Sequence, residues 1–559
     1  MTAILKYALG LGTLVVDAEE PRAEANTDIS TRTPTGPTIH LDPGADIGAA
    51  VYANPDATIE CSPGVYPPTT FRKPPGHGYT TVRPTGTLED RPYKPADVAS
   101  GVHIIGTGGA AWGASAIAGE IPYRINLLGV HASAPANSHP LTFCGVADLA
   151  IEKATRTQDL PWDWLLDRCV NQTPSTTDRR WAFLANGVSI GGINSYFGPA
   201  HWDVWPAGVD SQGLGFYQGP GPFTFRKCVI WGAEEPVASG NAGNDGVGNA
   251  CQSRMSDFLF EHCLFYRAPA ARRLIQCKNG SEFKQGSRVK YRYCIIRNTW
   301  PDTQQAGWGY FTWSGAEEFW SGTHDHILEG VWFQNTAGIA GFDPHFHDRY
   351  NPAFKRLLMR NCVATGFSAA SICSAPEGGR YHDRAFEFDQ ENSPSGVHVV
   401  HEATIERSLV FTSGRGINEL VRIAPQLHRN FRFRGNLMGV APGGTWGPKI
   451  LISDQEGDAA VAGIAGSGFS WTKNTIVAPA GAQTVTTGTG VSDNNYPASI
   501  AALQLVDATQ LDNTEPTPAD LGGLKLSGTS PYLGTGLAGD DPGPDIDTLI
   551  TEHASVPTV

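Results

Sequence analysis

The amino-acid sequence predicts an all-β protein in which similar coils stack on one another. Three observations predict this class: a short motif recurs along the chain, no helical periodicity separates its copies, and turn-forming residues are abundant. The 559 residues include 65 glycines and 40 prolines, and only 17% are charged. This composition disfavours a coiled coil, long exposed helices and extensive disorder.

The N-terminal part contains few strong strand patterns. Residues 1–36 end in the sequence Thr-Arg-Thr-Pro-Thr-Gly-Pro, so we expect an N-terminal arm or attachment segment there. Residues 46–53 predict a short helix that caps the open end of the first coil, where backbone edges would otherwise be exposed. Residues 57–66 follow as the first coil.

The recurring motif has the frame apolar-x-apolar-x-x-small-x-apolar. Its first three positions alternate, which indicates a strand with one buried face, and we expect a second short strand to begin at the small residue. Copies with cysteine, serine or asparagine at the small position are Trp164–Val170, Phe223–Ile230, Phe258–Phe265, Val289–Ile296, Leu357–Ala364, Ala403–Val410, Phe431–Met438 and Phe469–Ile476.

A single strand pair per turn cannot bury its apolar face alone, so the copies are expected to stack in register at about 4.8 Å. The small positions then form an inward ladder, in which Asn436 and Asn474 continue the recurring cysteines. Such a ladder accounts for the repeated cysteines without disulfides or metal. We expect the stacked coils to span residues 37–480 and a closing region to span residues 481–559.

These repeats resemble the right-handed single-stranded parallel β-helix of the pectate-lyase-like superfamily. The resemblance is closer to a group of bacterial and phage β-helix proteins that is tailspike-like, and it extends over roughly residues 37–550. It is carried by the repeats and by the segments 210–213, 219–223, 276–283, 298–301, 530–536 and 540–547. The resemblance implies the fold, but the superfamily includes pectin-degrading enzymes, other polysaccharide lyases, glycosidases and tailspikes, and the fold does not choose among them.

Charge and motif content exclude several function classes. The net charge of −14 argues against a general nucleic-acid binder, which needs clustered basic residues. No apolar run reaches the roughly 20 residues of a membrane span. The cysteines form no CxxC motif, and His324 and His326 come without a third ligand, so we predict no metal and no cofactor.

The first candidate site is a group of acidic residues between glycine-rich turns: Asp210, Glu234, Glu235 and Asp245. Paired carboxylates perform glycoside hydrolysis, one as the acid and the other as the base or nucleophile, so these four are the predicted catalytic residues. The alternative interpretation is that they cap turns or lie in solvated loops.

The second candidate is a basic stripe within residues 254–297, from which Arg272 and Arg273 are predicted to bind substrate. A basic stripe suits an anionic polysaccharide, and the resemblance implies that an arginine or lysine of a lyase removes the proton beside a uronate carboxyl. The alternative is that these residues point outward and pair with acidic neighbours.

The third candidate is an aromatic and acidic region within residues 301–348. Trp308, Tyr310, Trp313 and Trp320 are predicted to stack on sugar faces. The alternative is that several of these rings pack in the core.

Together these features favour a phage-type tailspike or virion spike that binds a cell-surface polysaccharide, and they leave open whether it also depolymerises that polysaccharide. Such a protein would be a homotrimer, would contact virion attachment proteins through its arm, and would be located on the virion or outside the cell. One alternative is a free bacterial polysaccharide lyase or glycoside hydrolase, and another is a non-catalytic structural or adhesive β-helix.

Overall fold

The structure, a computed structural model, describes most of the chain. The described residues are 18–98, 100–107, 109–114, 120–135, 141–144, 160–172, 180–200, 211–217, 219–232, 235–240, 255–269, 278–300, 307–313, 323–343, 355–366, 384–388, 401–411, 419–423, 430–439, 449–452, 455–464 and 468–559. No helix within these ranges combines the length and the apolar composition that a membrane crossing requires.

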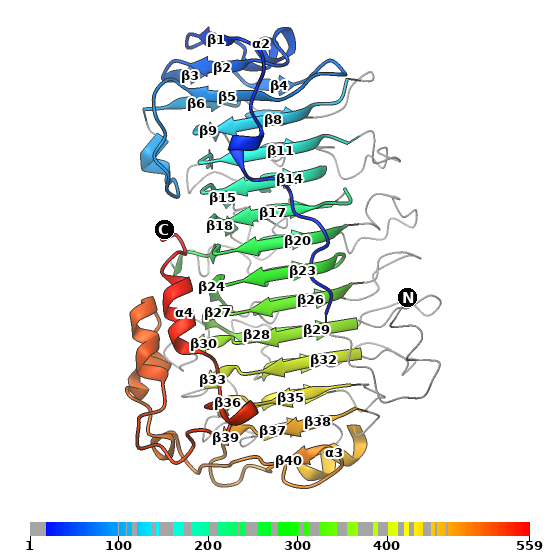
Figure 1. Cartoon of the computed structure of the whole chain (residues 1–559), viewed down its shortest axis with the longest axis vertical. Coiled ribbons are helices and arrows are strands. Elements are labelled where there is room, and N and C mark those ends of the chain that lie inside the picture. Colours follow the sequence, from blue (N-terminus) through cyan, green and yellow to red (C-terminus); the bar gives the residue numbers. More distant parts are fainter. Residues whose placement is uncertain are drawn as a thin grey trace, which may run out of the picture.

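The described strands form three parallel sheets that run along a rod (Figure 1). Successive strands enter the sheets in rotation, so that neighbours within one sheet are mostly three strands apart in the chain. This arrangement is a right-handed parallel β-helix, which confirms the predicted fold class. Each turn contains three strands, however, and not the single pair that the motif predicts.

We name the sheets A, B and C. Sheet A consists of β1 Thr38–Leu41, β2 Thr58–Cys61, β5 Thr80–Pro84, β8 Tyr123–Leu128, β11 Trp162–Asp167, β14 Val188–Ile193, β17 Phe223–Arg226, β20 Ser256–Glu261, β23 Ser287–Arg292, β26 His324–Glu329, β29 Lys355–Arg360, β32 His401–Glu406, β35 Arg432–Arg434, β38 Ser470–Thr472 and β40 Val491–Ser492. Sheet B consists of β3 Gly64–Tyr66, β6 Val102–Ile105, β9 Val130–Ser133, β12 Val170–Asn171, β15 Tyr196–Ala200, β18 Val229–Gly232, β21 Leu264–Tyr266, β24 Ile295–Thr299, β27 Trp332–Thr336, β30 Val363–Thr365, β33 Leu409–Phe411, β36 Leu437–Gly439 and β39 Thr475–Val477. Sheet C consists of β4 Thr69–Phe71, β7 Trp112–Ala114, β10 Thr142–Cys144, β13 Trp181–Ala185, β16 Gln212–Phe216, β19 Glu235–Ser239, β22 Ser281–Phe283, β25 Trp308–Trp313, β28 Gly338–Asp343, β31 Arg384–Phe388, β34 Glu419–Ile423 and β37 Lys449–Ile452.

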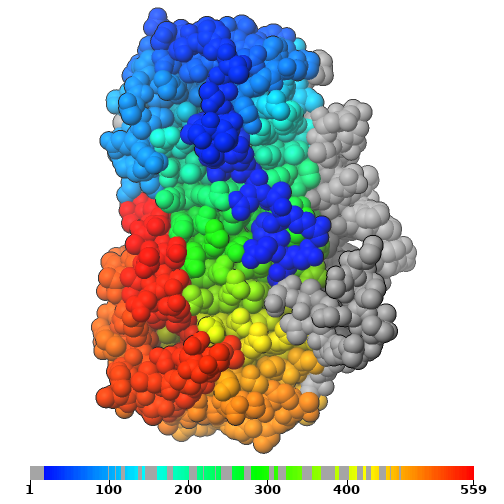
Figure 2. Space-filling model, in the orientation of Figure 1, coloured from blue at the N-terminus to red at the C-terminus, as the bar shows by residue number. Residues whose placement is uncertain are grey.

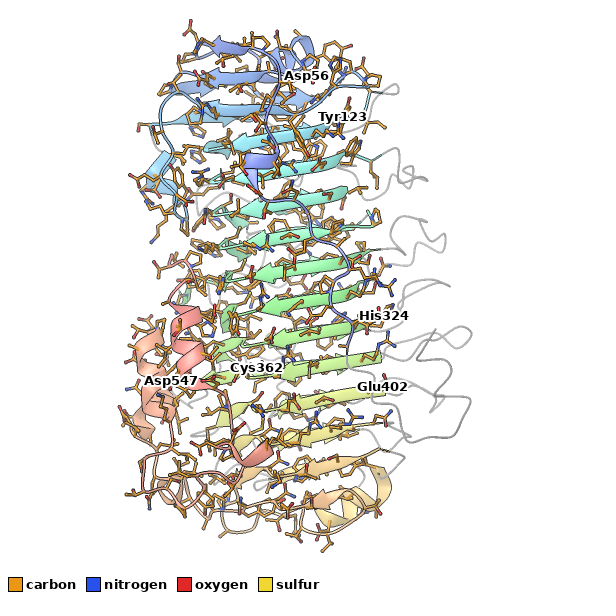
Figure 3. All side chains as sticks on the ribbon, in the orientation of Figure 1. Asp56, Tyr123, His324, Cys362, Glu402 and Asp547 are labelled. Atoms are coloured by element: carbon orange, nitrogen blue, oxygen red, sulfur yellow. The ribbon has the colours of Figure 1, made fainter. Side chains whose placement is uncertain are left out.

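The recurring motif forms the corner between sheets A and B. The residue before the small position adopts a left-handed backbone, with φ of 50° at Lys227 and 51° at His262, and the chain turns there from sheet A into sheet B. The cysteine that follows lies in the turn, so the strand of sheet B begins one residue later than predicted. Cys362, labelled in Figure 3, occupies this position between β29 and β30.

The small residues form the predicted inward ladder. Cys263 is buried, and its Sγ donates to the carbonyl oxygen of Phe225 on the preceding coil at 3.3 Å. Further along, Asn436 Nδ2 donates to Asn474 Oδ1 at 3.0 Å, and Asn474 donates in the same way to Asn494. The inward ladder is therefore confirmed, and its amide part is longer by one member than the motif shows.

Helices lie at both ends of the rod. Helix α2, Ile47–Ala53, begins after Asp46, whose carboxylate accepts from the backbone N–H groups of residues 48 and 49. Ile47 and Val51 of this helix join the main core, which confirms the predicted N-terminal capping helix. At the other end, helix α3, Asp458–Ile464, buries Val461 and Ile464 in the same core.

Two terminal segments cover the outer faces of sheets A and B (Figure 2). The N-terminal segment, residues 18–36 with the short helix η1 Ile29–Thr31, runs back along sheet A. Its backbone N–H groups donate to side chains of the sheet, including Glu19 to Asp325 at 3.0 Å and Arg22 to Asp257 at 2.8 Å.

The C-terminal segment covers an apolar row of sheet B. It contains η6 Ile500–Leu503, η7 Ala508–Asp512, η8 Pro518–Leu524, η9 Leu537–Gly539 and α4 Ile546–His553. Its leucines and isoleucines pack on outward residues of successive strands, which include Leu264, Ile295, Trp332, Val363, Leu409 and Leu437. The helix η2 Pro95–Val98 covers the same sheet nearer the N-terminal end, where Lys94 Nζ donates to Thr558 Oγ1 at 3.1 Å.

Candidate functional site on sheet C

Sheet C presents two outward rows of residues, one row at the start of its strands and one row three residues further on. In the first row Trp181 pairs with Gln212, and Gln212 pairs with Glu235. In the second row Ala238 pairs with Glu282, and Glu282 pairs with Phe311. The two rows bring acidic residues of β19 and β22 together between aromatic residues of β13 and β25.

Glu235 and Glu282 form a buried carboxyl pair. Glu235 is fully buried, Glu282 is 1% exposed, and each carboxyl group lies close enough to the other to shift its pKa. Burial and the neighbouring Glu282 raise the pKa of Glu235 well above its usual value. Burial alone would raise the pKa of Glu282 too, but Lys284, Glu235 and Lys278 together lower it below the usual value.

Two buried lysines and one asparagine surround this carboxyl pair. Lys278 and Lys284 are 7% and 8% exposed, and Lys284 Nζ lies 2.9 Å from Glu282 Oε1. Asn279 Nδ2 donates to Glu282 Oε2 at 2.8 Å, while its own Oδ1 accepts from the backbone N–H of Trp308 at 3.1 Å. These contacts favour the ionised form of Glu282.

The pair has the character of an acid and a base. Carboxyls whose surroundings push their pKa values apart are the arrangement by which one site performs acid and base chemistry at one pH. Because the two side chains touch, they are closer than the ~5 Å that separates the carboxyls of a retaining glycosidase. The carboxyl groups of Glu235 and Glu282 would therefore approach a bound sugar from the same side.

Trp308 and Trp181 lie against sheet C, one on each side of the carboxyl pair. The sheet positions beneath each ring are glycines, because a larger residue there would collide with the ring. A Cβ atom on Gly338 would come within 2.3 Å of the Trp308 ring, and one on Gly341 within 2.7 Å. On the other side, a Cβ atom on Gly215 would lie 2.7 Å from the Trp181 ring. Both rings are 3% exposed.

The structure places three of the predicted site residues. Glu235 belongs to the carboxyl pair, and Trp308 lies on the outer face of sheet C beside Phe311. Tyr310, in contrast, is fully buried in the main core, where its hydroxyl is hydrogen-bonded to His326 Nδ1. The Tyr310 ring is therefore not available to stack on a sugar, because it lies between the two outward rows of sheet C and faces the core. The side chain of Trp313 and the whole of Asp210, Glu234, Asp245, Arg272, Arg273 and Trp320 lie outside the described residues.

Three cations in the described part of the basic stripe pair with acidic residues. Arg288 Nε lies 2.6 Å from Asp257 Oδ1, Lys290 Nζ lies 2.9 Å from Glu329 Oε2, and Arg292 forms an ion pair with Glu261. These cations project from sheet A, and Arg288 and Arg292 belong to rows in which positive and negative side chains alternate. Their arrangement agrees with the alternative interpretation, in which such charges pair with their neighbours.

The predicted site residues do not include Gln212, Lys278, Lys284 and Glu282. Gln212 lies in the segment 210–213, and the other three lie in or beside the segment 276–283, both of which carry the family resemblance. Their grouping depends on the register of sheet C, which the motif does not predict. Within the described ranges, no three histidine, cysteine or acidic side chains are grouped as a metal site would need.

No protein-family model and no curated protein matches the sequence. Among solved structures, the chain is similar to a mannuronic acid-specific polysaccharide family 6 lyase from human gut microbiota, with 11% identity, a TM-score of 0.40, and coverage of 93% of this chain and 100% of that one. It is also similar to the catalytic unit of a GH87 α-1,3-glucanase from Streptomyces thermodiastaticus, with 12% identity, a TM-score of 0.35, and coverage of 82% and 70%. A tailspike protein of E. coli bacteriophage HK620 gives 9% identity, a TM-score of 0.30, and coverage of 78% and 76%. Similarity at this level concerns the fold and does not decide the function.

Proposed function

We propose that this protein binds and depolymerises a polysaccharide on the outer face of sheet C, with Glu235 as the general acid and Glu282 as the general base. The observation that carries the proposal is the buried contact between these two carboxyls, whose pKa values are shifted in opposite directions. Trp181 and Trp308 flank the pair at a separation of four strands, about 19 Å at the usual strand spacing. That length suits several sugar residues of one chain.

The chemistry conserves the single proton of the pair. Protonated Glu235 transfers its proton to the glycosidic oxygen of the leaving sugar as the carbon–oxygen bond breaks. Ionised Glu282, beside Lys284, accepts a proton either from an attacking water or from the sugar carbon next to a uronate carboxyl. The first route is hydrolysis, which requires the acid and base carboxyls to stand ~6.5–9.5 Å apart, so the contact between these two favours the second route, β-elimination.

Two isosteric substitutions test the proposal. Wild type is screened against a panel of bacterial capsular and cell-wall polysaccharides for loss of viscosity and for new reducing ends. Glu235→Gln and Glu282→Gln should each lower the rate about a hundredfold or more. Glu406→Gln serves as the matched control, because Glu406 pairs with Arg434 on sheet A and should not affect cleavage. Equal rates in wild type and both site variants would refute the assignment.

The products distinguish the two routes. Reducing ends that appear together with the ultraviolet absorbance of an unsaturated uronate identify a lyase, and reducing ends without it identify a hydrolase. Binding of a polysaccharide without cleavage would favour the adhesive alternative. The predictions for Asp210, Glu234 and Asp245 are tested alongside, since Asp210→Asn and Glu234→Gln should abolish activity if those acids take part.

The role as a virion spike, with a homotrimeric assembly and an extracellular or virion location, stays a prediction. Measuring the mass in solution tests the trimer, and fractionating native particles or culture medium locates the chain. The exposed large apolar side chains among the described residues are Tyr52, Val65, Val506, Leu533 and Val559, which are dispersed over the chain. A trimer would therefore need polar contacts or residues outside the described ranges.

A further inference from the structure

The side-chain amide of Gln212 is held in one orientation. Its Oε1 accepts from the indole Nε1 of Trp181 at 2.5 Å and from the hydroxyl of Tyr217 at 2.8 Å. Because an indole N–H can only donate, the oxygen of the amide must face Trp181. The amide nitrogen consequently faces Glu235, where Nε2 donates to Oε2 at 3.2 Å.

The hydrogen bond from Gln212 makes the two carboxyl oxygens of Glu235 unequal. Oε2 accepts from Gln212, whereas Oε1 is buried and accepts no hydrogen bond from any described residue. The charged groups that face Glu235 are Glu282, Lys278 and Lys284. A proton on Oε1 satisfies this oxygen and also supplies the hydrogen bond between the two carboxyls.

We propose that Gln212, oriented by Trp181 and Tyr217, is a positioning residue that directs the protonated oxygen of Glu235 toward Glu282 and the substrate. The inference rests on the proposed function of the carboxyl pair. When Glu235 Oε1 gives its proton to the leaving oxygen, negative charge develops on the carboxylate, and the Nε2–H group of Gln212 stabilises it through Oε2. Gln212 thus orients the carboxyl group of Glu235 and, by stabilising the resulting carboxylate, favours release of its proton.

The first experiment does not require a substrate. Glutamate carboxyls are labelled with carbon-13 in the whole protein, and each is titrated by NMR, with the signals assigned by Glu235→Gln and Glu282→Gln. In wild type, one glutamate should remain protonated near neutral pH, and its signal should be absent from Glu235→Gln. Gln212→Met, which has a similar volume but no N–H donor, should shift the titration midpoint of this carboxyl to higher pH.

A second variant guards against misfolding of the first. Tyr217→Phe removes one of the two groups that orient the amide and should shift the midpoint in the same direction by a smaller amount. Far-ultraviolet circular dichroism and the unfolding midpoint establish that each variant is folded. Full ionisation of every glutamate at neutral pH in wild type would overturn the inference, as would an unchanged midpoint in both folded variants.

The second experiment uses the polysaccharide that wild type cleaves. Gln212→Met should lower kcat about tenfold or more with little change in KM, because a hydrogen bond to a developing charge is lost, and the alkaline limb of the pH–rate profile should move upward. A purely structural role would leave that limb in place. If wild type cleaves no polysaccharide, the proposed function fails, while the NMR titration still decides whether Gln212 positions the proton.

Discussion

Glu235 carries a carboxyl group that would be ionised in water at neutral pH, but folding buries it. It lies fully buried beside a second carboxyl, so folding favours its neutral form and raises its pKa. The unfolded chain releases this proton as pH rises through the ordinary glutamate range, whereas the folded chain retains it. Wild type therefore loses some stability between that range and the higher pKa of the folded state.

Replacing the two glutamates should have opposite effects on stability. Glu235→Gln removes a group that must stay protonated, so we expect a higher unfolding midpoint in urea at pH 8 than for wild type, with the difference vanishing near pH 4. Glu282→Gln deprives Lys284 of its counter-ion and should destabilise by roughly 3 kcal/mol at pH 8. Shifts of the same sign for both variants would contradict the assigned protonation states.

The ladder position of Cys263 makes a second prediction at this scale. Cys263→Asp places an unpaired charge in a packed interior and should lower the free energy of unfolding by several kcal/mol. Cys263→Ser is the matched control, because Ser408 occupies the equivalent position on another coil and accepts an N–H bond there. A fully stable aspartate variant would show that this side chain does not point inward.

At the scale of elements, sheet A is organised by an outward row whose charges alternate from strand to strand. The strand register places each arginine beside a glutamate. The side chains in the middle of the row are partly buried. The row consists of Arg226, Glu261, Arg292, Glu329, Arg360, Glu406 and Arg434. Adjacent opposite charges stabilise this register, and like charges in neighbouring strands would oppose it.

Reversing one charge in this row tests its contribution. Arg360→Glu places three like charges on consecutive strands and should destabilise by about 1 kcal/mol at low salt, because Arg360 is partly exposed and screened by solvent. Arg360→Gln should have a smaller effect. The difference between the two variants should shrink in high salt, as unfolding curves at two ionic strengths would reveal. A difference that does not depend on salt would exclude an electrostatic origin.

At the scale of the whole molecule, three histidines, of which two are buried and one is half-buried, connect stability to pH. His326 lies in the core beside Tyr310, His553 of α4 packs on Trp332, and His131 lies in sheet B. Burial lowers the pKa of each to about 3. The folded protein thus holds these rings neutral at pH values where the unfolded chain protonates them.

Acid should therefore destabilise the rod. Because the folded pKa of each histidine is depressed, its contribution is present above the ordinary histidine pKa and is lost as pH falls from about 6.5 toward 3. Urea unfolding at pH 7, 5.5 and 4.5 should give a steadily lower midpoint. His553→Leu should reduce this dependence on pH, since it removes one of the three groups. An identical slope in wild type and the variant would rule out His553 as a contributor.

The parts of the fold that could be predicted are those that a short, local sequence pattern specifies. The corner between sheets A and B has constant length, with a two-residue alternation, a left-handed residue and a small ladder residue, so its copies are visible along the chain. The capping helix α2 was predicted for a similar reason, because Asp46 and the apolar residues that follow form a local signal. Stacking of such units follows from the apolar faces that each leaves exposed.

By itself, the sequence determined the stacked coil, its inward ladder and its N-terminal cap, because each depends on neighbours within a few residues. Only the tertiary structure decided that a third sheet exists and that Glu235 and Glu282, 47 positions apart by their numbers, lie side by side. Connections of differing length lead into and out of sheet C, so no constant spacing marks its strands. The site takes its residues from several turns of the rod, and only the register between those turns brings them into contact.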